Sequence, residues 1–190
     1  MTNRPTFTPL RLETPRLILR HFVPADAAAL YRYRNDPEVA RYQGWNPPTE
    51  AEAQAFALQQ SRQPPAVPDV WLQLALGLRA TGETVGDVAF QTDGAGQAEF
   101  GYSLARAFQG RGYMTEAVER LLGYLFGDLG LHRVTAHVDV RNEASFRLLE
   151  RVGLRREGRF VEAHLLRGEW TSEYGYALLA REWNARRGGA

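Results

Sequence analysis

Two glycines stand where a predicted strand passes into a long predicted helix. Gly110 and Gly112 follow the strand predicted over residues 98–104 and precede the helical pattern. The first turn of a helix leaves about four backbone amides without partners and carries roughly half a positive charge. Because glycine has no Cβ, a diphosphate can approach those amides closely. The segment therefore predicts a phosphate-binding turn, while a simple tight loop is the alternative.

A dinucleotide-binding turn is a further alternative for the same segment, because Asp139 closes the next predicted strand as an acidic ribose ligand would. However, Thr115 stands where that fingerprint has its third glycine, and Asp139 lies beyond the usual spacing of about 20 residues. The turn also follows antiparallel strands rather than opening a series of βαβ units. An NAD(P)-binding oxidoreductase is therefore a distant alternative.

A second group of polar residues opens the next predicted helix. Asn142 and Ser145 are three residues apart and share one helix face. If the strands before the two helices are neighbours, these side chains lie beside the phosphate turn and flank a thioester channel. In the alternative interpretation, Asn142 is only an N-cap and Ser145 bonds the backbone of the first turn.

The elements that position these residues predict an α/β domain with a mixed sheet. In the middle of the chain apolar residues alternate, and turns at Gly82 and Gly94 separate three runs, which is typical of an antiparallel meander. A helical apolar period follows over residues 114–129, and then a strand over residues 133–140. This βαβ crossover makes the strand at residues 98–104 parallel to the strand at residues 133–140.

Further elements complete a sheet of about seven strands with helices on both faces. Strands are predicted over residues 16–20, 160–166 and 172–179. One helix is predicted from Pro24 onward. Another is predicted over residues 49–60, with a capping box at its start.

Length and composition are those of an ordinary globular domain. The chain has 190 residues, 44% of them hydrophobic and 24% charged, with a formal net charge of +1. We expect a flexible N-terminus over residues 1–10, a single domain over residues 11–183 and a C-terminal tail over residues 184–190. The balanced charge argues against a nucleic-acid partner. Without a signal-peptide pattern or an apolar run of about 20 residues, a cytoplasmic protein with no membrane partner is expected.

The sequence also limits the chemistry. It contains no cysteine, which excludes a disulfide, a thiolate metal site and a cysteine nucleophile. The four histidines lack a metal-ligand spacing such as HExxH, so no metal is expected. Any acyl transfer must therefore proceed without a cysteine intermediate.

The two central motifs resemble those of the GNAT acetyltransferases. Residues 109–114 (QGRGYM) are similar to the superfamily's Q/R-x-x-G-x-G/A turn, and residues 142–154 to its N-x-x-S-x-x-L-x-E-x-x-G-F helix. Met114 departs from the small final residue of the turn, and Leu154 stands in place of phenylalanine. The resemblance covers about residues 11–183.

Shorter similarities point to the RimJ/RimL branch, which acetylates protein N-termini, amino acids, antibiotics or polyamines. They lie in residues 12–20, 100–102 and 182–183. The resemblance implies an N-acetyltransferase that moves an acetyl group directly from acetyl-CoA, its co-substrate, to a primary amine in a ternary complex. The amine would belong to a small molecule or to a protein N-terminus. A non-catalytic acyl-CoA-binding or sensor module is the alternative, and a homodimer is a possibility that the sequence leaves open.

By the same resemblance, the thioester lies in a V between the strands that end at Leu104 and Val140, with the Leu104 backbone against pantetheine. Asn142 and Ser145 face the thioester and carry catalytic as well as binding roles. The implied coenzyme-binding residues are Leu104, Gln109, Gly110, Arg111, Gly112, Tyr113, Met114, Thr115, Asn142 and Ser145.

The acceptor amine must be neutral when it attacks. An α-amino group with a pKa near 8 is roughly 10% neutral at pH 7, whereas a lysine-type amine is neutral in under about one part in a thousand. Glu99, on the strand that leads to the turn, is our candidate to accept the proton through water; a solvated strand carboxylate is the alternative. The reserve candidates are His137, Asp139, Glu162 and His164.

Two further sets of residues complete the expected site. Ser145, Tyr102 or Tyr113 would return a proton to the departing thiolate. Family members place their two N-terminal helices at the acceptor mouth, so Tyr31, Tyr42 and Trp45 are our candidate substrate residues. As aromatic residues they would equally suit the core.

Overall fold

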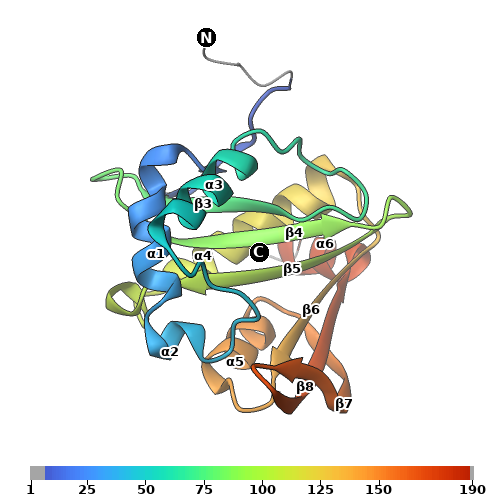
Figure 1. The fold of residues 1–190 in the computed structure, drawn as a ribbon. Coiled ribbons are helices and arrows are strands. Elements are labelled where there is room, and N and C mark those ends of the chain that lie inside the picture. The colour runs from blue at the N-terminus through green and yellow to red at the C-terminus, as the bar shows by residue number, and fades with distance from the viewer. Residues whose placement is uncertain (1–6, 189–190) are drawn as a thin grey trace.

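The computed structural model describes residues 7–188, which form one mixed sheet with helices on both faces (Figure 1). The strand order is β1-β2-β3-β4-β5-β6-β8-β7, and every neighbouring pair is antiparallel except β5 and β6. This confirms the predicted α/β class, the meander and the parallel crossover. The strands are β1 (Arg11–Glu13), β2 (Leu17–His21), β3 (Leu72–Leu78), β4 (Thr84–Thr92), β5 (Gln97–Leu104), β6 (Arg133–Asp139), β7 (Arg155–Leu166) and β8 (Glu169–Leu179).

The helices cover the sheet in two groups. α1 and α3 lie on one face, over β3 and β4, and α4 and α6 lie on the other (Figure 1). Each group has its own apolar cluster, because each face of the sheet buries alternate side chains. The helical segments are η1 (Pro24–Asp26), α1 (Ala27–Arg34), α2 (Pro37–Ala40), α3 (Glu50–Gln60), η2 (Arg106–Phe108), α4 (Tyr113–Gly123), the π-helical η3 (Tyr124–Asp128), α5 (Glu143–Arg151) and α6 (Ala180–Gly188).

The observed elements differ from the predicted ones in several places. The sheet has eight strands, not seven, because the three-residue β1 buries only Leu12 and so has no readable alternation. β7 begins at Arg155, five residues before the predicted start. The segment predicted as a C-terminal tail is helical as far as Gly188. Of the N-terminal segment predicted to be flexible, residues 1–6 lie outside the described chain, as do residues 189–190 at the other end.

β5 and β6 pair over only three positions before they separate. The paired residues are 97 with 133, 98 with 134 and 99 with 135. Beyond Glu99, β5 continues to Leu104 while β6 continues to Asp139, paired on its other side with β8 along its whole length. Figure 1 shows the two strands diverging toward α5. The sheet therefore opens between the carboxyl ends of its two parallel strands, where α/β sheets place their ligands.

α4 fixes the position of the turn that follows β5. It buries one stripe of side chains against the sheet, as the 3.6-residue period predicts. Burial of each such apolar side chain stabilises the folded state by roughly 1.5–3 kcal/mol. Met114 belongs to this stripe and is 6% exposed, so its side chain points into the core and away from the turn.

Candidate active site

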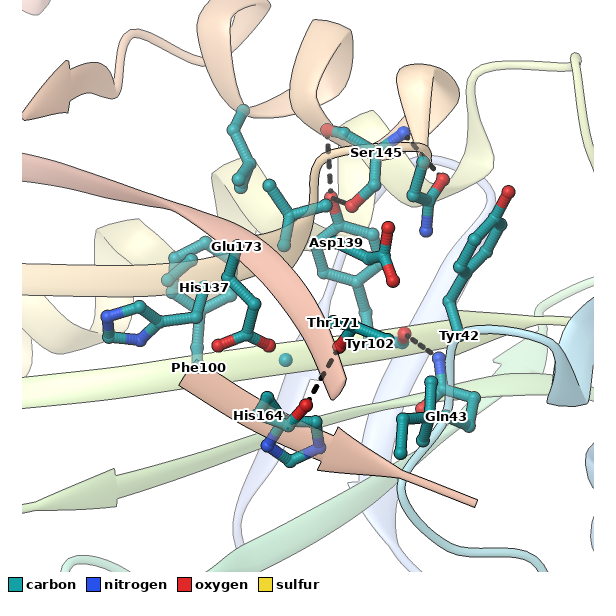
Figure 2. A pocket seen from close by; sticks show the side chains of 16 residues that line it. Tyr42, Gln43, Phe100, Tyr102, His137, Asp139, Ser145, His164, Thr171 and Glu173 are labelled. Atoms are coloured by element: carbon teal, nitrogen blue, oxygen red, sulfur yellow. Dashed lines mark hydrogen bonds between the residues drawn. The ribbon is translucent and has the colours of Figure 1, made fainter. Parts of the chain in front are cut away.

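The opening between β5 and β6 contains a cavity of about 150 Å³. Its walls come from both diverging strands, from α5, from the loop after α2 and from the β7–β8 hairpin (Figure 2). The lining residues are Tyr42, Gln43, Phe100, Gly101, Tyr102, Ala136, His137, Val138, Asp139, Asn142, Ser145, Leu149, His164, Leu166, Thr171 and Glu173.

The turn between β5 and α4 presents backbone amides. Gly110 and Gly112 have φ angles of +73° and +77°, in the left-handed region that favours glycine, and Gly112 is the N-cap of α4. The first amide that closes a helical hydrogen bond is that of Glu116, to the Gly112 carbonyl. Within residues 7–188, the amides of residues 110–115 donate to no backbone acceptor. The turn therefore offers a group of free amides at a helix N-terminus, an arrangement that suits a diphosphate.

The backbone of β5 is also free along the opening. The bonds from Ala105 N to Val85 O and from Asp93 N to Gln97 O show that odd-numbered residues of β5 bond β4. Even-numbered residues direct their backbone groups toward β6. Beyond the last paired position, the amides of Tyr102 and Leu104 therefore face the opening, where carbonyl groups of an extended arm can bond them. The Leu104 carbonyl already accepts from Gln109 Nε2 at 2.9 Å.

Tyr102 and Ser145 meet across the opening. Their hydroxyl oxygens are 2.8 Å apart, and the Tyr102 hydroxyl lies 3.2 Å from the Ser145 carbonyl (Figure 2). Burial raises the pKa of Tyr102 to about 12, although the hydrogen bond with Ser145 lowers it. Tyr102 is therefore protonated at neutral pH and able to donate.

Asn142 is the N-cap of α5 and also lines the cavity. Its side-chain oxygen accepts from the Ser145 amide at 3.2 Å. The capping role that we considered as an alternative is thus present, whereas the Ser145 hydroxyl bonds the Tyr102 hydroxyl. The cap orients the first turn of α5 so that Ser145 faces β5.

Glu99 and His137 form a pair at the point where the strands separate. Glu99 Oε1 lies 3.1 Å from His137 Nδ1. The hydrogen bond with Glu99 raises the pKa of His137 above its ordinary value and outweighs burial, which lowers it; the charges of Glu99 and Glu173 add to the increase. His137 lines the cavity, whereas Glu99 lies in the neighbouring depression beside Thr135.

Asp139 is a buried carboxylate on the same wall. Burial favours its neutral form, but hydrogen bonds from Arg141 and the charge of that guanidinium prevail and hold the pKa of Asp139 below its ordinary value. The Arg141 amide also donates to Asp139, so the pair fixes the turn into α5. Tyr42 donates to the Arg141 carbonyl at 3.3 Å, which ties the loop after α2 to this turn.

A network of buried hydrogen bonds and one ion pair also holds the loop after α2. Arg34 Nη2 lies 2.6 Å from Asp87 Oδ1, and Tyr33 donates to Asp87 at 2.5 Å. Arg34 also donates to Gln43 Oε1, while Gln43 Nε2 donates to the Tyr102 carbonyl at 3.3 Å (Figure 2). The network therefore joins the core of the α1 face to β5 at the cavity.

The predicted acceptor residues occupy different places. Tyr42 lines the cavity. Tyr31 packs on the α1–α3 apolar cluster, and the Trp45 ring packs at a tilt against Phe56 with 4.6 Å between ring centroids; neither is among the lining residues. Glu162, a reserve candidate for the base, also lies outside the lining.

Sequence reasoning missed Gln43, Thr171 and Glu173 as lining residues. No motif marks them, because they reach the cavity through the loop after α2 and through the β7–β8 hairpin. Only the antiparallel pairing of β8 with β6, 173 with 139, brings Glu173 to this wall. The alternation of β8 indicates which residues share its faces, but it gives no partner strand.

The described residues were also compared with the requirements of a metal site and of a membrane-spanning helix. In the described part of the chain, no group of three or more His, Asp or Glu side chains is arranged to hold a metal ion. None of the helices within residues 7–188 has both the length and the apolar character needed to cross a bilayer.

Comparison with known proteins assigns the chain to the class that the fold and the opening in the sheet indicate, the acyltransferase enzymes. A family model described as an acetyltransferase (GNAT) domain matches residues 16–155, and the chain belongs to this family. It is 32% identical over 176 residues to the uncharacterized N-acetyltransferase YnaD of Bacillus subtilis, covering 92% of this chain and 100% of that protein.

Two other relatives refine the comparison. The [ribosomal protein uS5]-alanine N-acetyltransferase of Escherichia coli is 32% identical over 87 residues, 46% of this chain and 45% of that protein. A GNAT-family acetyltransferase structure from Bacillus anthracis has a TM-score of 0.82 at 28% identity, covering 91% of this chain and 100% of that one. Together they confirm the predicted GNAT fold and support the RimJ/RimL-like branch.

Proposed function

We propose that this N-acetyltransferase takes its acetyl group from acetyl-CoA and transfers it directly to a primary amine of a small molecule or a protein N-terminus. The observation that carries the proposal is the separation of β5 and β6 after three paired positions, which leaves the end of β5 without a strand partner on this side, beside a cavity. At the end of the same strand, the amides of residues 110–115 donate to no backbone acceptor within residues 7–188. A donor with a diphosphate, an amide-bearing arm and a thioester fits these three features in order.

Each part of the site has its own role in binding the donor and the acceptor. Amides of the turn hold the diphosphate, and the backbone of Tyr102 and Leu104 binds the arm. Acetyl-CoA supplies the acetyl group as a thioester. Asn142 and Ser145 limit the space around the thioester on the α5 side. The acceptor enters from the side of Tyr42 and the β7–β8 hairpin.

Proton transfer completes the reaction. The amine nitrogen bonds the acetyl carbon, and the carbon–sulfur bond breaks. We propose that the amine proton passes to His137, which faces the cavity, and that Glu99 acts through its hydrogen bond to this imidazole. The thiolate receives a proton from Tyr102, which Ser145 contacts. One proton passes from the amine to His137 and one from Tyr102 to the sulfur; solvent then takes the proton from His137 and returns one to Tyr102, so both groups are restored.

An acceptor screen tests the proposal. Thiol release from acetyl-CoA is measured with peptides, free amino acids, aminoglycosides and polyamines, and one of these classes should give saturable turnover. A protein that binds coenzyme A tightly but turns over with none of them would be the sensor module instead. Stabilisation by NADP but not by coenzyme A in a thermal-shift assay would revive the oxidoreductase alternative.

Peptides with a free α-amino group are the first acceptors to test. Two observations favour them: the matched relative is named as an N-acetyltransferase of an alanine of ribosomal protein uS5, and an α-amine needs little help to become neutral. The matched control is the same peptide with its N-terminus blocked and an internal lysine retained. Equal turnover of both peptides would contradict the α-amine preference.

A further inference from the structure

The N-terminal segment between β1 and β2 reaches the coenzyme turn, about 100 residues further along the chain. Arg16 Nε donates to Glu116 Oε2 at 2.6 Å, and the Arg16 amide donates to Glu116 Oε1 at 2.9 Å. Thr14 Oγ1 donates to the same Oε1 at 2.5 Å. Glu116 lies in the first turn of α4, so two residues before β2 bind the start of this helix.

Arg16 also contacts the turn itself. Its Nη1 donates to the Arg111 carbonyl at 2.9 Å, and its guanidinium carbon lies 4.5 Å from the centre of the Tyr113 ring. A Cβ placed on Gly112 would lie 3.4 Å from Arg16 Nη2. The guanidinium therefore covers Gly112 and contacts the residues on both sides of it.

The segment that carries Arg16 is itself well anchored. The Thr14 hydroxyl accepts from the Leu17 amide at 2.8 Å, and Arg79 Nη1 donates to the Thr14 carbonyl at 2.9 Å. The Arg79 amide donates to the Arg16 carbonyl at 2.9 Å. The Arg16 side chain thus extends from a fixed backbone, although it is 46% exposed itself.

The Arg16 contact also neutralises the charge of Glu116. Burial favours the neutral form of Glu116, but bonds from Thr14 and Arg16 and the Arg16 charge lower its pKa, so the carboxylate stays ionised. An unpaired negative charge in the first turn of α4 would repel a diphosphate at the same helix end. Arg16 compensates that charge, and it does so next to the amides of the turn.

We propose that Arg16, paired with Glu116, is a positioning residue that holds the turn over residues 109–113 in the shape required to bind the diphosphate of the acetyl donor. The inference rests on the proposed function. A turn with two left-handed glycines has many conformations when free, and ordering each residue costs conformational entropy. By holding the Arg111 carbonyl and the start of α4, Arg16 reduces the ordering that remains when the donor binds.

The test compares two donors that differ in the group concerned. Acetyl-CoA carries the diphosphate, whereas S-acetylpantetheine has the same thioester and arm without any phosphate. Arg16→Gln should raise the KM of acetyl-CoA on the order of tenfold and leave kcat within about twofold, because the lost bonds to charged groups act on binding. The KM of S-acetylpantetheine should not change. A general loss of structure would affect both donors equally.

Matched variants make the result specific. Arg11→Gln removes a nearby arginine of β1, whose exposed side chain bonds only Glu13 among the described residues, and it should behave as wild type with both donors. Arg16→Lys keeps a charge but cannot reach Glu116 and the Arg111 carbonyl together, so it should give an intermediate loss with acetyl-CoA. If Arg16→Gln does not fold, Arg16→Lys decides the question.

Direct binding separates this inference from the proposed function. Coenzyme A and pantetheine are titrated calorimetrically into wild type and Arg16→Gln, with thermal unfolding as the check on folding. Wild type that does not bind coenzyme A would overturn the proposed function. Wild type that binds coenzyme A, together with Arg16→Gln that binds it equally well, would overturn the role of Arg16 alone. Weaker binding of both ligands to the variant would also contradict it.

Discussion

The hydroxyl oxygens of Tyr102 on β5 and Ser145 on α5 lie 2.8 Å apart across the opening in the sheet. No strand pairing connects β5 to β6 at this level, because their ladder ends at Glu99 and Thr135. The side-chain bond therefore spans a place where the backbone is open. It also places an ionisable hydroxyl that stays protonated at neutral pH on the wall of the cavity.

Tyr102→Phe should lower kcat about 100-fold, since general acid catalysis contributes on this scale, with little change in the KM of acetyl-CoA. Steady-state thiol release at saturating amine measures the effect. Tyr124→Phe is the matched control, because this buried tyrosine packs on Phe90 outside the cavity lining. Full activity of Tyr102→Phe would exclude Tyr102 as the proton donor.

The pair formed by Glu99 and His137 predicts a pH dependence. The groups that face His137 are Glu99 on β5, Glu173 on β8 and the Phe160 ring on β7. If neutral His137 accepts the amine proton, kcat should rise as pH rises through the pKa of His137, which Glu99 holds above its ordinary value. Glu99→Gln should therefore move this acid limb to lower pH.

His137→Gln completes this test, because it should remove the acid limb and lower kcat about 100-fold. The measurement is kcat at saturating donor and acceptor between pH 5 and 9, approximately the range in which histidine titrates. An acid limb at the same pH in wild type, Glu99→Gln and His137→Gln would show that the pair does not take the proton.

Gly112→Ala should weaken coenzyme binding and lower stability by about 1 kcal/mol, because alanine is strained at a φ of +77°. Gly110→Ala is a useful companion, since φ is +73° and no atom lies within 4 Å of the position of its Cβ. Its effect on stability would therefore come from backbone strain alone, whereas its effect on coenzyme binding would also include the added Cβ in the path of the diphosphate. Calorimetric titration with coenzyme A and urea unfolding measure the two quantities. Wild-type affinity in both variants would contradict the role of the turn.

Breaking the buried pair of Arg34 and Asp87 should be costly. The Asp87 side chain is 0% exposed, so Asp87→Asn leaves a buried guanidinium without its counter-charge and should lower the free energy of unfolding by about 3–5 kcal/mol. Arg147→Ala, which breaks the exposed pair with Glu143, should cost under about 1 kcal/mol. Urea unfolding of both variants tests the contrast, and equal losses would contradict it.

Glu116 predicts a loss of stability in acid. Its folded-state pKa lies below the ordinary carboxylate value, so its contribution is fully present above the unfolded pKa and disappears as pH falls through the folded one. Glu116→Gln should therefore make unfolding less sensitive to pH in the acidic range. The check is the urea midpoint measured from neutral pH down to the acid transition. If the urea midpoint of Glu116→Gln falls with pH as steeply as that of wild type, the bonds from Arg16 and Thr14 to the Glu116 carboxylate do not stabilise the folded state.

The sequence predicted the parts of the site that local patterns encode. The two glycines and the apolar period after them indicated the turn and α4, and Asn142 with Ser145 indicated the start of α5. Strand–helix–strand order then required that the two motifs meet. These inferences needed only the spacing of residues and the handedness of the crossover, because the residues concerned lie within about 50 positions of one another.

Contacts between distant segments could not be predicted in this way. The Arg16–Glu116 contact joins residues 100 positions apart, and nothing in the alternation of β2 selects its partner. Glu173 reaches the cavity only because β8 pairs with β6, a register that alternation alone does not fix. The sequence likewise could not show that Trp45 would pack against Phe56 rather than face the cavity, since the same aromatic side chain suits both environments.

The short ladder between β5 and β6 gives the domain a built-in seam. Three paired positions, with α4 behind them, connect the five-stranded half of the sheet to the three-stranded half. An extended arm that binds the open edge of β5 acts as a temporary strand and supplies hydrogen bonds that the protein itself lacks. Each round of acyl transfer would then begin by stiffening the sheet and end by loosening it, so hydrogen exchange along this seam should report directly whether a donor is bound.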